Sequence, residues 1–333
     1  MPCGAHVRAQ DIADVIVIGA GMTGLSAAAR LKSADVDVIV VDKARGVGGR
    51  MASRRIGDAG FDHGAQFITA EDQQFAAALA SWQKAGVVRS CFQSETNVSA
   101  ENTCWCGTPA MTAVAKHLVV GIETRLEQRV VKLQCVDTHW KVVLANGDSI
   151  TTKAVLLTPP VPQSLMLLEA SSIRLLAALQ TELAAVEYQR CITVMAVLEA
   201  PSSIPHPGFI APQDSPIAWI ADNQVKGIST LPAVTIQASD DFSRKHWDDD
   251  RNVIGGQLID MAAPLLGSSV ESFQVHGWLY SMPAVSSTRR FVTLEQSPPL
   301  ILAGDAFVKP RAEGAWYSGQ AAAGAIQATL QTL

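Results

Sequence analysis

The sequence predicts an α/β fold in which a parallel, helix-covered sheet is combined with a smaller α+β unit built on a mostly antiparallel sheet. Between residues 14 and 42 a buried apolar strand leads through a glycine-rich turn into a helix and a second buried strand. Near the other end, residues 300–302 form a further apolar strand that ends in a Gly-Asp pair. Between them, residues 189–283 alternate as the strands of an antiparallel sheet do, with one helical stretch at 242–265.

The composition is that of a protein with a large apolar interior. Of 333 residues, 48% are hydrophobic and 17% charged, which excludes a disordered chain and fits about two domains of roughly 150 residues each. The net charge is −5 without an offsetting basic stripe, so we expect no nucleic-acid partner. Mean hydropathy is high at +0.18, yet the apolar runs fall short of the roughly 20 residues that a membrane span requires. Because residues 1–8 also lack a signal peptide, we expect a cytoplasmic protein without a membrane partner.

Cysteine and histidine residues indicate neither a metal site nor a disulfide framework. Six cysteines in a chain of this length do not predict such a framework. Cys104 and Cys106 are separated by one residue, which is typical of side chains on the same face of a strand. The seven histidines are scattered, and none follows this pair at metal-ligand spacing. We therefore expect no bound metal.

The first glycine-rich turn has the GxGxxG pattern between a strand and a helix, which is typical of dinucleotide binding. Gly19 permits the tight turn, Gly21 lets the backbone approach a pyrophosphate, and Gly24 lets the helix pack on the strand. Met22 and Thr23 open the helix, whose free N–H groups face the negative charge. Asp42 ends the second strand 18 residues after Gly24, where it would accept hydrogen bonds from the adenosine ribose hydroxyls. This pattern fits NAD and FAD equally.

A second glycine-rich segment favours FAD. Residues 42–51 contain two arginines and a glycine doublet, which could wrap the same pyrophosphate from its other side or form a basic surface loop. The segment resembles the glycine doublet followed by arginine of the flavin amine oxidase superfamily. The expected cofactor contacts here are Lys43, Arg45, Gly49, Arg50 and Met51.

Further segments resemble the same superfamily and imply the remaining FAD contacts. Residues 61–67 resemble the segment that runs beside the isoalloxazine, and Asp305 resembles the aspartate that binds a ribityl hydroxyl. A helix opening near residue 313 would point its positive N-terminus at N1 and O2 of the flavin and favour the anionic reduced ring. Residue 130 resembles the valine whose backbone meets the adenine. The contacts implied are His63, Gly64, Ala65, Gln66, Val130, Thr158, Gly304, Asp305, Glu313, Gly314 and Ala315.

The resemblance implies two interleaved domains, because the FAD motifs lie at opposite ends of the chain. A Rossmann-like FAD-binding domain of the glutathione-reductase-like, amine oxidase type would comprise residues 1–66, 105–158 and 284–333. A substrate domain would comprise residues 67–104 and 159–283.

Residues 46–55, 219–223 and 278–283 narrow the resemblance to renalase-like proteins and their bacterial relatives. This implies an oxidase that passes hydride from 2- or 6-dihydro isomers of NAD(P)H to flavin N5. The products would be NAD(P)+ and, with O2 as acceptor, H2O2. An amine oxidase, or another CH–NH or CH–CH oxidase of the same fold, is the alternative. A flavin-binding sensor without turnover is a third possibility, and the oligomeric state stays open.

The candidate substrate residues are neutral and largely aromatic, as suits an electron-rich dihydronicotinamide that needs stacking and orientation rather than a strong base. Asn223, Gln237, Trp278 and Tyr280 are the expected pocket residues, with Trp219 and Tyr317 as further candidates. Relatives often carry histidine where Gln237 stands. The lysine that amine oxidases place near flavin N5 has no evident counterpart, and Lys309 fits an exposed loop at least as well.

Overall fold

The computed structural model describes residues 12–92, 103–284, 287 and 289–332. The first residues of the chain, on which the expectation of no signal peptide rests, lie outside these ranges. None of the described helices combines the length and the apolar character that crossing a bilayer requires.

The larger sheet has the order β16-β17-β10-β1-β2-β7, with β9 joining β10 and β8 joining β9. Its centre is parallel and consists of short runs of Val, Ile and Leu, as expected for strands covered on both faces. The strands are β1 (Ile12–Ile18), β2 (Val38–Val41), β7 (Glu123–Arg125), β8 (Val130–Val136), β9 (His139–Leu144), β10 (Ser149–Leu157), β16 (Val292–Gln296) and β17 (Pro299–Leu302).

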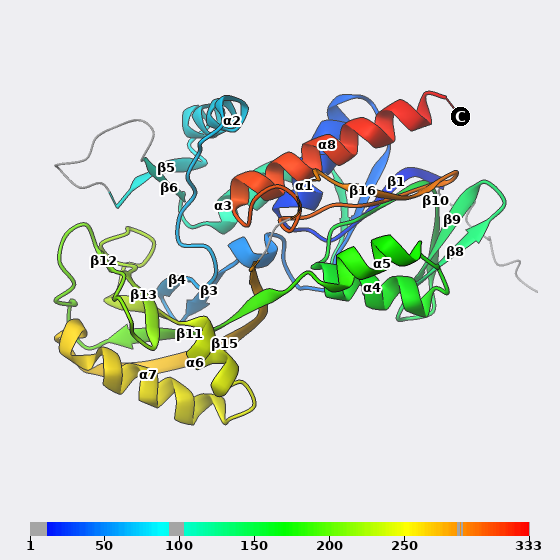
Figure 1. Ribbon diagram of the computed structural model, residues 1–333. Helices are drawn as coiled ribbons and strands as arrows, with labels where there is room; N and C mark the ends of the chain where they lie inside the picture. The colour runs from blue at the N-terminus through cyan, green and yellow to red at the C-terminus, as the bar shows by residue number, and fades with distance from the viewer. Residues whose placement is uncertain (1–11, 93–102, 285–286, 288, 333) are drawn as a thin grey trace, which may run out of the picture.

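Helices cover both faces of this sheet, because alternate residues of each strand point to opposite sides. Val15 and Val17 of β1 pack with helices α1 (Met22–Ser33) and α8 (Ala312–Leu330). Ile16 and Ile18 pack in the other core, with α4 (Val161–Ala170) and α5 (Ala177–Ala184). Figure 1 shows α1 and α8 on one side of the sheet and α4 and α5 on the other.

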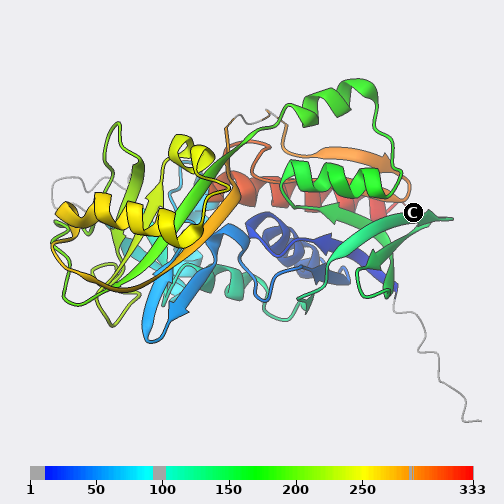
Figure 2. The ribbon, with the colours of Figure 1, turned by 90° about the horizontal axis from the view of Figure 1, so that it is seen from below.

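The second sheet has the order β12-β13-β14-β11-β15, and all its neighbours are antiparallel. This confirms the expected fold class. The strands are β11 (Tyr188–Leu198), β12 (Phe209–Ile210), β13 (Ile217–Asp222), β14 (Ala233–Ala238) and β15 (Val270–Pro283). The long strands β11 and β15 run back toward the parallel sheet, which Figure 2 shows from below.

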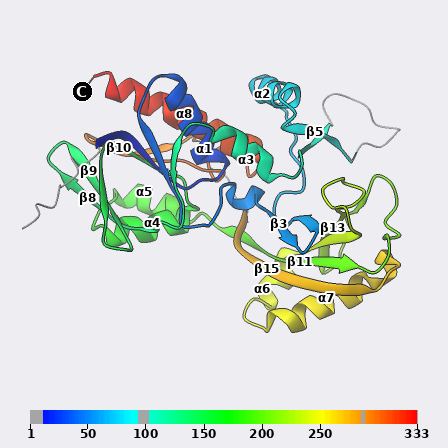
Figure 3. The ribbon, with the colours of Figure 1, turned by 180° about the vertical axis from the view of Figure 1, so that it is seen from behind.

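The helix predicted at 242–265 is two helices, α6 (Asp240–Lys245) and α7 (Arg251–Leu266). The single-helix prediction was wrong because the side chain of Asp250 accepts hydrogen bonds from the backbone N–H groups of Asn252 and Val253. Such a cap begins a new helix. Both helices lie on one face of the five-stranded sheet, and the hairpin of β3 (Ser53–Ile56) and β4 (Ala59–Asp62) lies on the other. Figure 3 shows β3 above β11 and beside β13, on the side of the five-stranded sheet opposite α6 and α7.

The predicted domain boundaries stay a prediction. Within the segments assigned to the substrate domain, α4 and α5 pack on the parallel sheet through Val161, Leu168 and Leu183. Helix α2 (Gln73–Lys84) contributes Phe75 and Leu79 to a core that it shares with the cofactor-side turns.

A disulfide that the sequence did not predict joins β5 (Val88–Cys91) to β6 (Cys104–Gly107). Cys104 and Cys106 alternate along β6 as expected, and Cys91 lies directly opposite Cys104 in the ladder. The bond nevertheless joins Cys91 to Cys106, and Cys104 keeps a free, half-buried thiol. Three cysteines therefore share one face of a two-stranded ribbon.

Thiol counting tests this pairing. In denatured protein prepared without reductant, Cys91→Ser should raise the number of titratable thiols by one, because it frees Cys106. Cys104→Ser should lower the count by one, because that thiol is free. A lower count for Cys91→Ser would show that the bond does not form.

Candidate cofactor and substrate site

The turn between β1 and α1 has the geometry that its glycines require. Gly19 has φ of +110°, a conformation that L side chains rarely adopt. A Cβ on Gly24 would lie 2.0 Å from the Gly19 carbonyl oxygen, whereas one on Gly21 would meet nothing within 4 Å. Close packing thus requires a glycine at position 24, whereas Gly21 faces open space. No described side chain caps α1, so its first N–H groups, from Met22 and Thr23 on, can bind an anion.

The second glycine-rich turn lies against the first. A Cβ on Gly49 would lie 3.4 Å from Cα of Gly21, and the Gly48 N–H donates to the Ala20 carbonyl at 2.8 Å. Asp42 directly follows β2 beside them and accepts hydrogen bonds from the Ala20 and Ala44 N–H groups at 2.6 and 2.7 Å. Its carboxylate oxygens retain lone pairs for further donors. The predicted pyrophosphate and ribose contacts therefore meet at one place.

An ion pair joins two predicted cofactor residues from opposite ends of the chain. Arg50 lies in a short 3-10 turn, Gly49–Met51, and its guanidinium donates to both carboxylate oxygens of Asp305 at 2.6 and 2.9 Å. Asp305 follows β17, at the carboxyl edge of the parallel sheet. Arg50 also donates to the Ser281 carbonyl of β15 at 3.3 Å. Both units of the fold thus contact this pair.

Gly304 and the start of α8 lie beside the Arg50–Asp305 ion pair. A Cβ on Gly304 would meet nothing within 4 Å, and its N–H donates to Ser318 of α8 at 2.9 Å. Ala315 packs with Met22 and Met51 in one core. Gly314 allows α8 to approach Lys309, whose carbonyl oxygen would lie 2.1 Å from a Cβ there.

Several residues that were predicted to contact FAD have partners within the protein. Glu313 accepts hydrogen bonds from the Glu71 and Asp72 N–H groups at 2.9 and 2.8 Å and so holds the start of α2. Thr158 donates to the Ile18 carbonyl at 2.8 Å, beside Gly19. Lys43 contacts Gln163 at 3.0 Å. Arg45 is exposed, Val130 pairs with Leu144 in the β8–β9 ladder, and Lys309 pairs with Glu71 at the surface.

The segment 62–66 lies between the Arg50 turn and the five-stranded sheet. The Ala65 N–H donates to the Arg50 carbonyl at 2.8 Å, and a Cβ on Gly64 would lie 2.0 Å from that same oxygen. Asp62, His63 and Gln66 are buried, whereas Gly64 and Ala65 are half-exposed. The segment therefore presents its two smallest residues at its open edge, as a flat ring lying against the backbone would require.

Side chains of the five-stranded sheet hold the carbonyls of this segment. Trp278 Nε1 donates to the His63 carbonyl at 2.8 Å, and Gln237 Nε2 donates to the Gly64 carbonyl at 2.7 Å. Thr235 donates to the Asp62 carbonyl at 3.1 Å and accepts from Asn223 Nδ2 at 2.9 Å. The structure thus brings together three of the four predicted pocket residues: Asn223, Gln237 and Trp278.

Of the other predicted pocket residues, Trp219 adjoins this group, opposite Gln237 in the β13–β14 ladder, whereas Tyr280 and Tyr317 pack elsewhere. Tyr280 packs against Tyr188 with ring centroids 5.5 Å apart and lines a separate cavity of about 390 Å³. Trp219 stacks on Phe209 at 4.4 Å in an aromatic cluster with Phe92. Tyr317 lies 5.9 Å from the Arg290 guanidinium.

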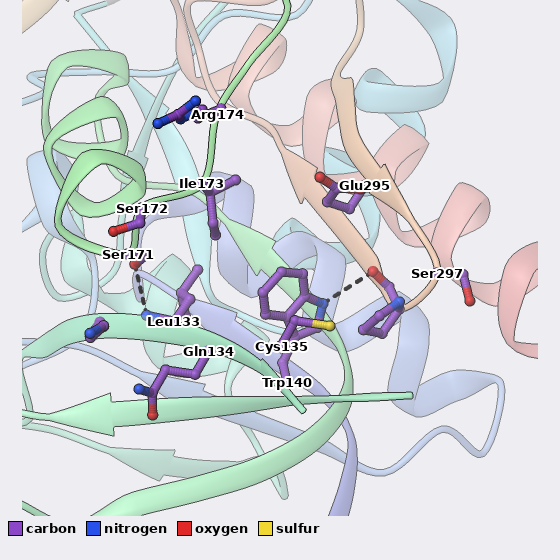
Figure 4. Close-up of a pocket in the computed structure, with 12 residues that line it drawn as sticks. Leu133, Gln134, Cys135, Trp140, Ser171, Ser172, Ile173, Arg174, Glu295 and Ser297 are labelled. Carbon is purple, nitrogen blue, oxygen red and sulfur yellow. Dashed lines mark hydrogen bonds between the residues drawn. The ribbon is translucent and has the colours of Figure 1, made fainter. Parts of the chain in front are cut away.

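A further cavity, of about 550 Å³, lies beside β8 and β9 and contains none of the predicted site residues. Figure 4 shows two hydrogen bonds between residues that line it, from the Leu133 N–H to Ser171 at 2.8 Å and from Trp140 Nε1 to the Pro298 carbonyl at 3.2 Å.

Sequence reasoning missed His276 and Lys226. The His276 ring lies 5.1 Å from that of His63 and 4.3 Å from that of Trp278. The alternation of β15 places His276 on the face of Trp278, so extending the pattern by two residues would have found it. Lys226 forms a buried ion pair with Asp62 at 2.8 Å, and no sequence pattern signals that contact.

Comparisons with known proteins agree with this geometry. A family profile described as an NAD(P)-binding Rossmann-like domain matches residues 17–82. Renalase of Mus musculus is 27% identical over 327 residues, covering 90% of this chain and 94% of the mouse protein. A solved structure from Exiguobacterium sp. 255-15, assigned as a protoporphyrinogen oxidase, has a TM-score of 0.73 at 13% identity, covering 97% of this chain and all of that one. A redesigned putrescine oxidase has a TM-score of 0.72 at 13% identity, covering 95% of this chain and 99% of that one.

The fold, its glycine-rich cofactor turns and these relatives support an FAD-dependent oxidoreductase with the fold of the amine oxidases. In sequence the chain is renalase-like, with the similarity to mouse renalase extending over 90% of its length.

Removing the Asp305 carboxylate tests the C-terminal half of the cofactor site. Asp305→Ala deletes an expected partner of FAD and leaves Arg50 without its bidentate acceptor. We expect FAD binding to weaken about 10- to 100-fold, the equivalent of one or two charge-assisted hydrogen bonds. The flavin-to-protein ratio of the purified protein measures this, with Asp148→Ala in the exposed β9–β10 turn as control. Full occupancy of Asp305→Ala would contradict the assignment.

His63 should make stability depend on pH. Burial, reinforced by His276, lowers the pKa of His63 to about 4 from 6.5. Between these values the unfolded chain binds the extra proton, so stability falls as the pH falls. Relative to His63→Gln, the wild-type free energy of unfolding should drop by about 2–3 kcal/mol from pH 7 to pH 4. Denaturant titrations measure it, with His117→Gln on an exposed helix face as control, and a constant difference would contradict the burial argument.

Proposed function

We propose that this protein is an FAD-dependent oxidase of dihydronicotinamides, returning 2- or 6-dihydro isomers of NAD(P)H to NAD(P)+. The observation that best supports this proposal is the balance of charges around the segment 62–66. The four buried carboxylates among the described residues are all engaged: Asp62 and Asp305 in ion pairs, and Asp222 and Glu313 by backbone N–H groups. A substrate ammonium would find no free carboxylate among them.

Neutral groups line the same place. Gln237 and Trp278 are uncharged, and the lowered pKa values of His63 and His276 keep both imidazoles neutral near pH 7, burial being the main cause in each. Asn223 Oδ1 is buried without a hydrogen-bond partner among the described residues. Such an acceptor suits the N–H₂ group of a nicotinamide carboxamide. A neutral, planar substrate therefore fits better than a cation.

The residues present fit FAD. In this proposal the Gly19–Gly24 turn, the α1 N-terminus and Arg50 hold the pyrophosphate, and Asp42 holds the adenosine ribose. Asp305 holds the ribityl chain, and the half-exposed edge at Gly64 and Ala65 lies beside the ring. FAD supplies the hydride-accepting ring, and the protein supplies binding, orientation and exclusion of water.

The overall reaction balances without a protein base. The dihydronicotinamide gives up one hydride, and O2 takes that hydride and one solvent proton to form H2O2. Because the substrate leaves as an aromatic cation, no side chain has to remove a proton from it. Stacking and orientation are then the demands on the site, as its neutral lining suggests.

Anaerobic mixing tests the proposal. Loss of the oxidised flavin absorbance with 2- or 6-dihydro-NAD(P), and not with putrescine, followed by H2O2 and NAD(P)+ on adding air, is the expected result. Reduction by putrescine alone would favour an amine oxidase. Reduction by dithionite but by neither substrate would favour a sensor without turnover.

Gln237→Ala should separate positioning from cofactor binding. It removes the donor to the Gly64 carbonyl, so we expect the rate of flavin reduction to fall about tenfold, equivalent to one hydrogen bond of about 1.4 kcal/mol, with FAD content preserved. Stopped-flow reduction measures it, with Gln134→Ala, exposed on β8, as control. Unchanged reduction would remove Gln237 from the pocket.

A further inference from the structure

A fully buried ion pair joins Asp62, the first residue of the segment 62–66, to Lys226. Lys226 Nζ lies 2.8 Å from Asp62 Oδ2, and both side chains have 0% exposed surface. Asp62 is the last residue of β4, and Lys226 lies in the loop between β13 and β14 of the five-stranded sheet. Removing both charges from water is costly, so such a pair is a weak source of stability and suggests a role in fixing one geometry.

Both ions have further partners that fix their positions. Asp62 Oδ1 accepts hydrogen bonds from Ser53 Oγ at 2.6 Å and from the Met111 N–H at 3.0 Å. The Lys226 ammonium lies 3.4 Å from Gln66 Oε1 and 5.5 Å from the centroid of the Phe92 ring. The ammonium therefore links Asp62 to Gln66.

The ammonium also determines which way the Gln66 amide points. Lys226 can only donate, so it must face the amide oxygen Oε1 and not the N–H₂ group. The amide nitrogen is thereby directed at the backbone, where Nε2 donates to the Asp62 carbonyl at 2.7 Å and to the Gly64 carbonyl at 3.2 Å. A flipped amide would place its donors against the ammonium.

The same carbonyls are held from the other side by the five-stranded sheet. Thr235 donates to the Asp62 carbonyl and Gln237 to the Gly64 carbonyl. Each of the two carbonyls thus accepts one bond from the sheet and one from Gln66. With Lys226 removed, the Gln66 amide loses the partner that sets its orientation, and Asp62 becomes an unpaired buried carboxylate.

We propose that Lys226 is a positioning residue of the cofactor site, which holds Asp62 and the Gln66 amide and thereby the backbone beside the flavin ring. This rests on the placement of FAD in the proposed function. Lys226 also neutralises Asp62. An unpaired carboxylate there would oppose the gain of electrons by the ring, so the pair sets the electrostatics of the site as well as its geometry.

The test compares Lys226→Met with the double variant Lys226→Met/Asp62→Asn, both as holoproteins. The double variant removes both charges at similar volume and guards against a single variant that fails to fold. Lys153→Met is the control, because it breaks an exposed ion pair with Asp14 on the parallel sheet. The readouts are the FAD dissociation constant, the flavin reduction potential and the visible flavin spectrum, none of which requires a substrate.

We expect Lys226→Met to bind FAD at least about tenfold more weakly and to lower the flavin potential. The double variant should recover the thermal stability and most of the potential, yet keep an altered flavin spectrum, because the Gln66 amide stays unconstrained. Wild-type affinity, potential and spectrum in the double variant would overturn the proposal and leave the pair a structural one. If the wild type binds FAD but no dihydronicotinamide reduces it, the proposed function fails while this comparison still stands.

Discussion

The placement of the segment 62–66 between the Arg50 turn and the five-stranded sheet is the constraint on which the site depends. On one side, the Arg50 carbonyl accepts the Ala65 N–H and approaches Gly64 so closely that no side chain would fit. On the other, donors from β14 and β15 hold the carbonyls. Because the two units of the fold meet on this backbone, a shift of either one would move the residues that we propose lie beside the cofactor.

The cofactor half of the site was predictable from the sequence because its signals are local. A buried strand, a glycine that requires positive φ, a glycine that a helix must approach and an acid at the next strand end all lie between Val15 and Asp42. Their spacing fixes their arrangement once the strand and helix form. The Asn146-Gly147 turn between β9 and β10 was predictable for the same reason.

The substrate half was less predictable because it depends on contacts between distant segments. Trp278 and Gln237 were singled out as residues facing a substrate, and the structure shows them donating to the backbone at His63 and Gly64. The Lys226–Asp62 pair joins residues 164 positions apart, and the disulfide follows a diagonal across the β5–β6 ladder. Neither contact follows a periodic pattern in the sequence. Both depend on how distant segments are aligned with one another in the folded chain.

The distribution of buried charge explains how a chain of modest charge content can enclose a polar cofactor. Two cations beside the site are each matched by one carboxylate from a distant part of the chain: half-buried Arg50 by Asp305, and fully buried Lys226 by Asp62. Isolated charges would be expelled from such an interior, whereas matched pairs leave it neutral and retain directional donors. Under the proposed function, such an interior would not attract an ammonium substrate, and shape and hydrogen bonding would discriminate between rings. The high apolar fraction of the sequence and its few paired charges therefore have the same cause, because an apolar interior around the site accepts charges only in matched pairs.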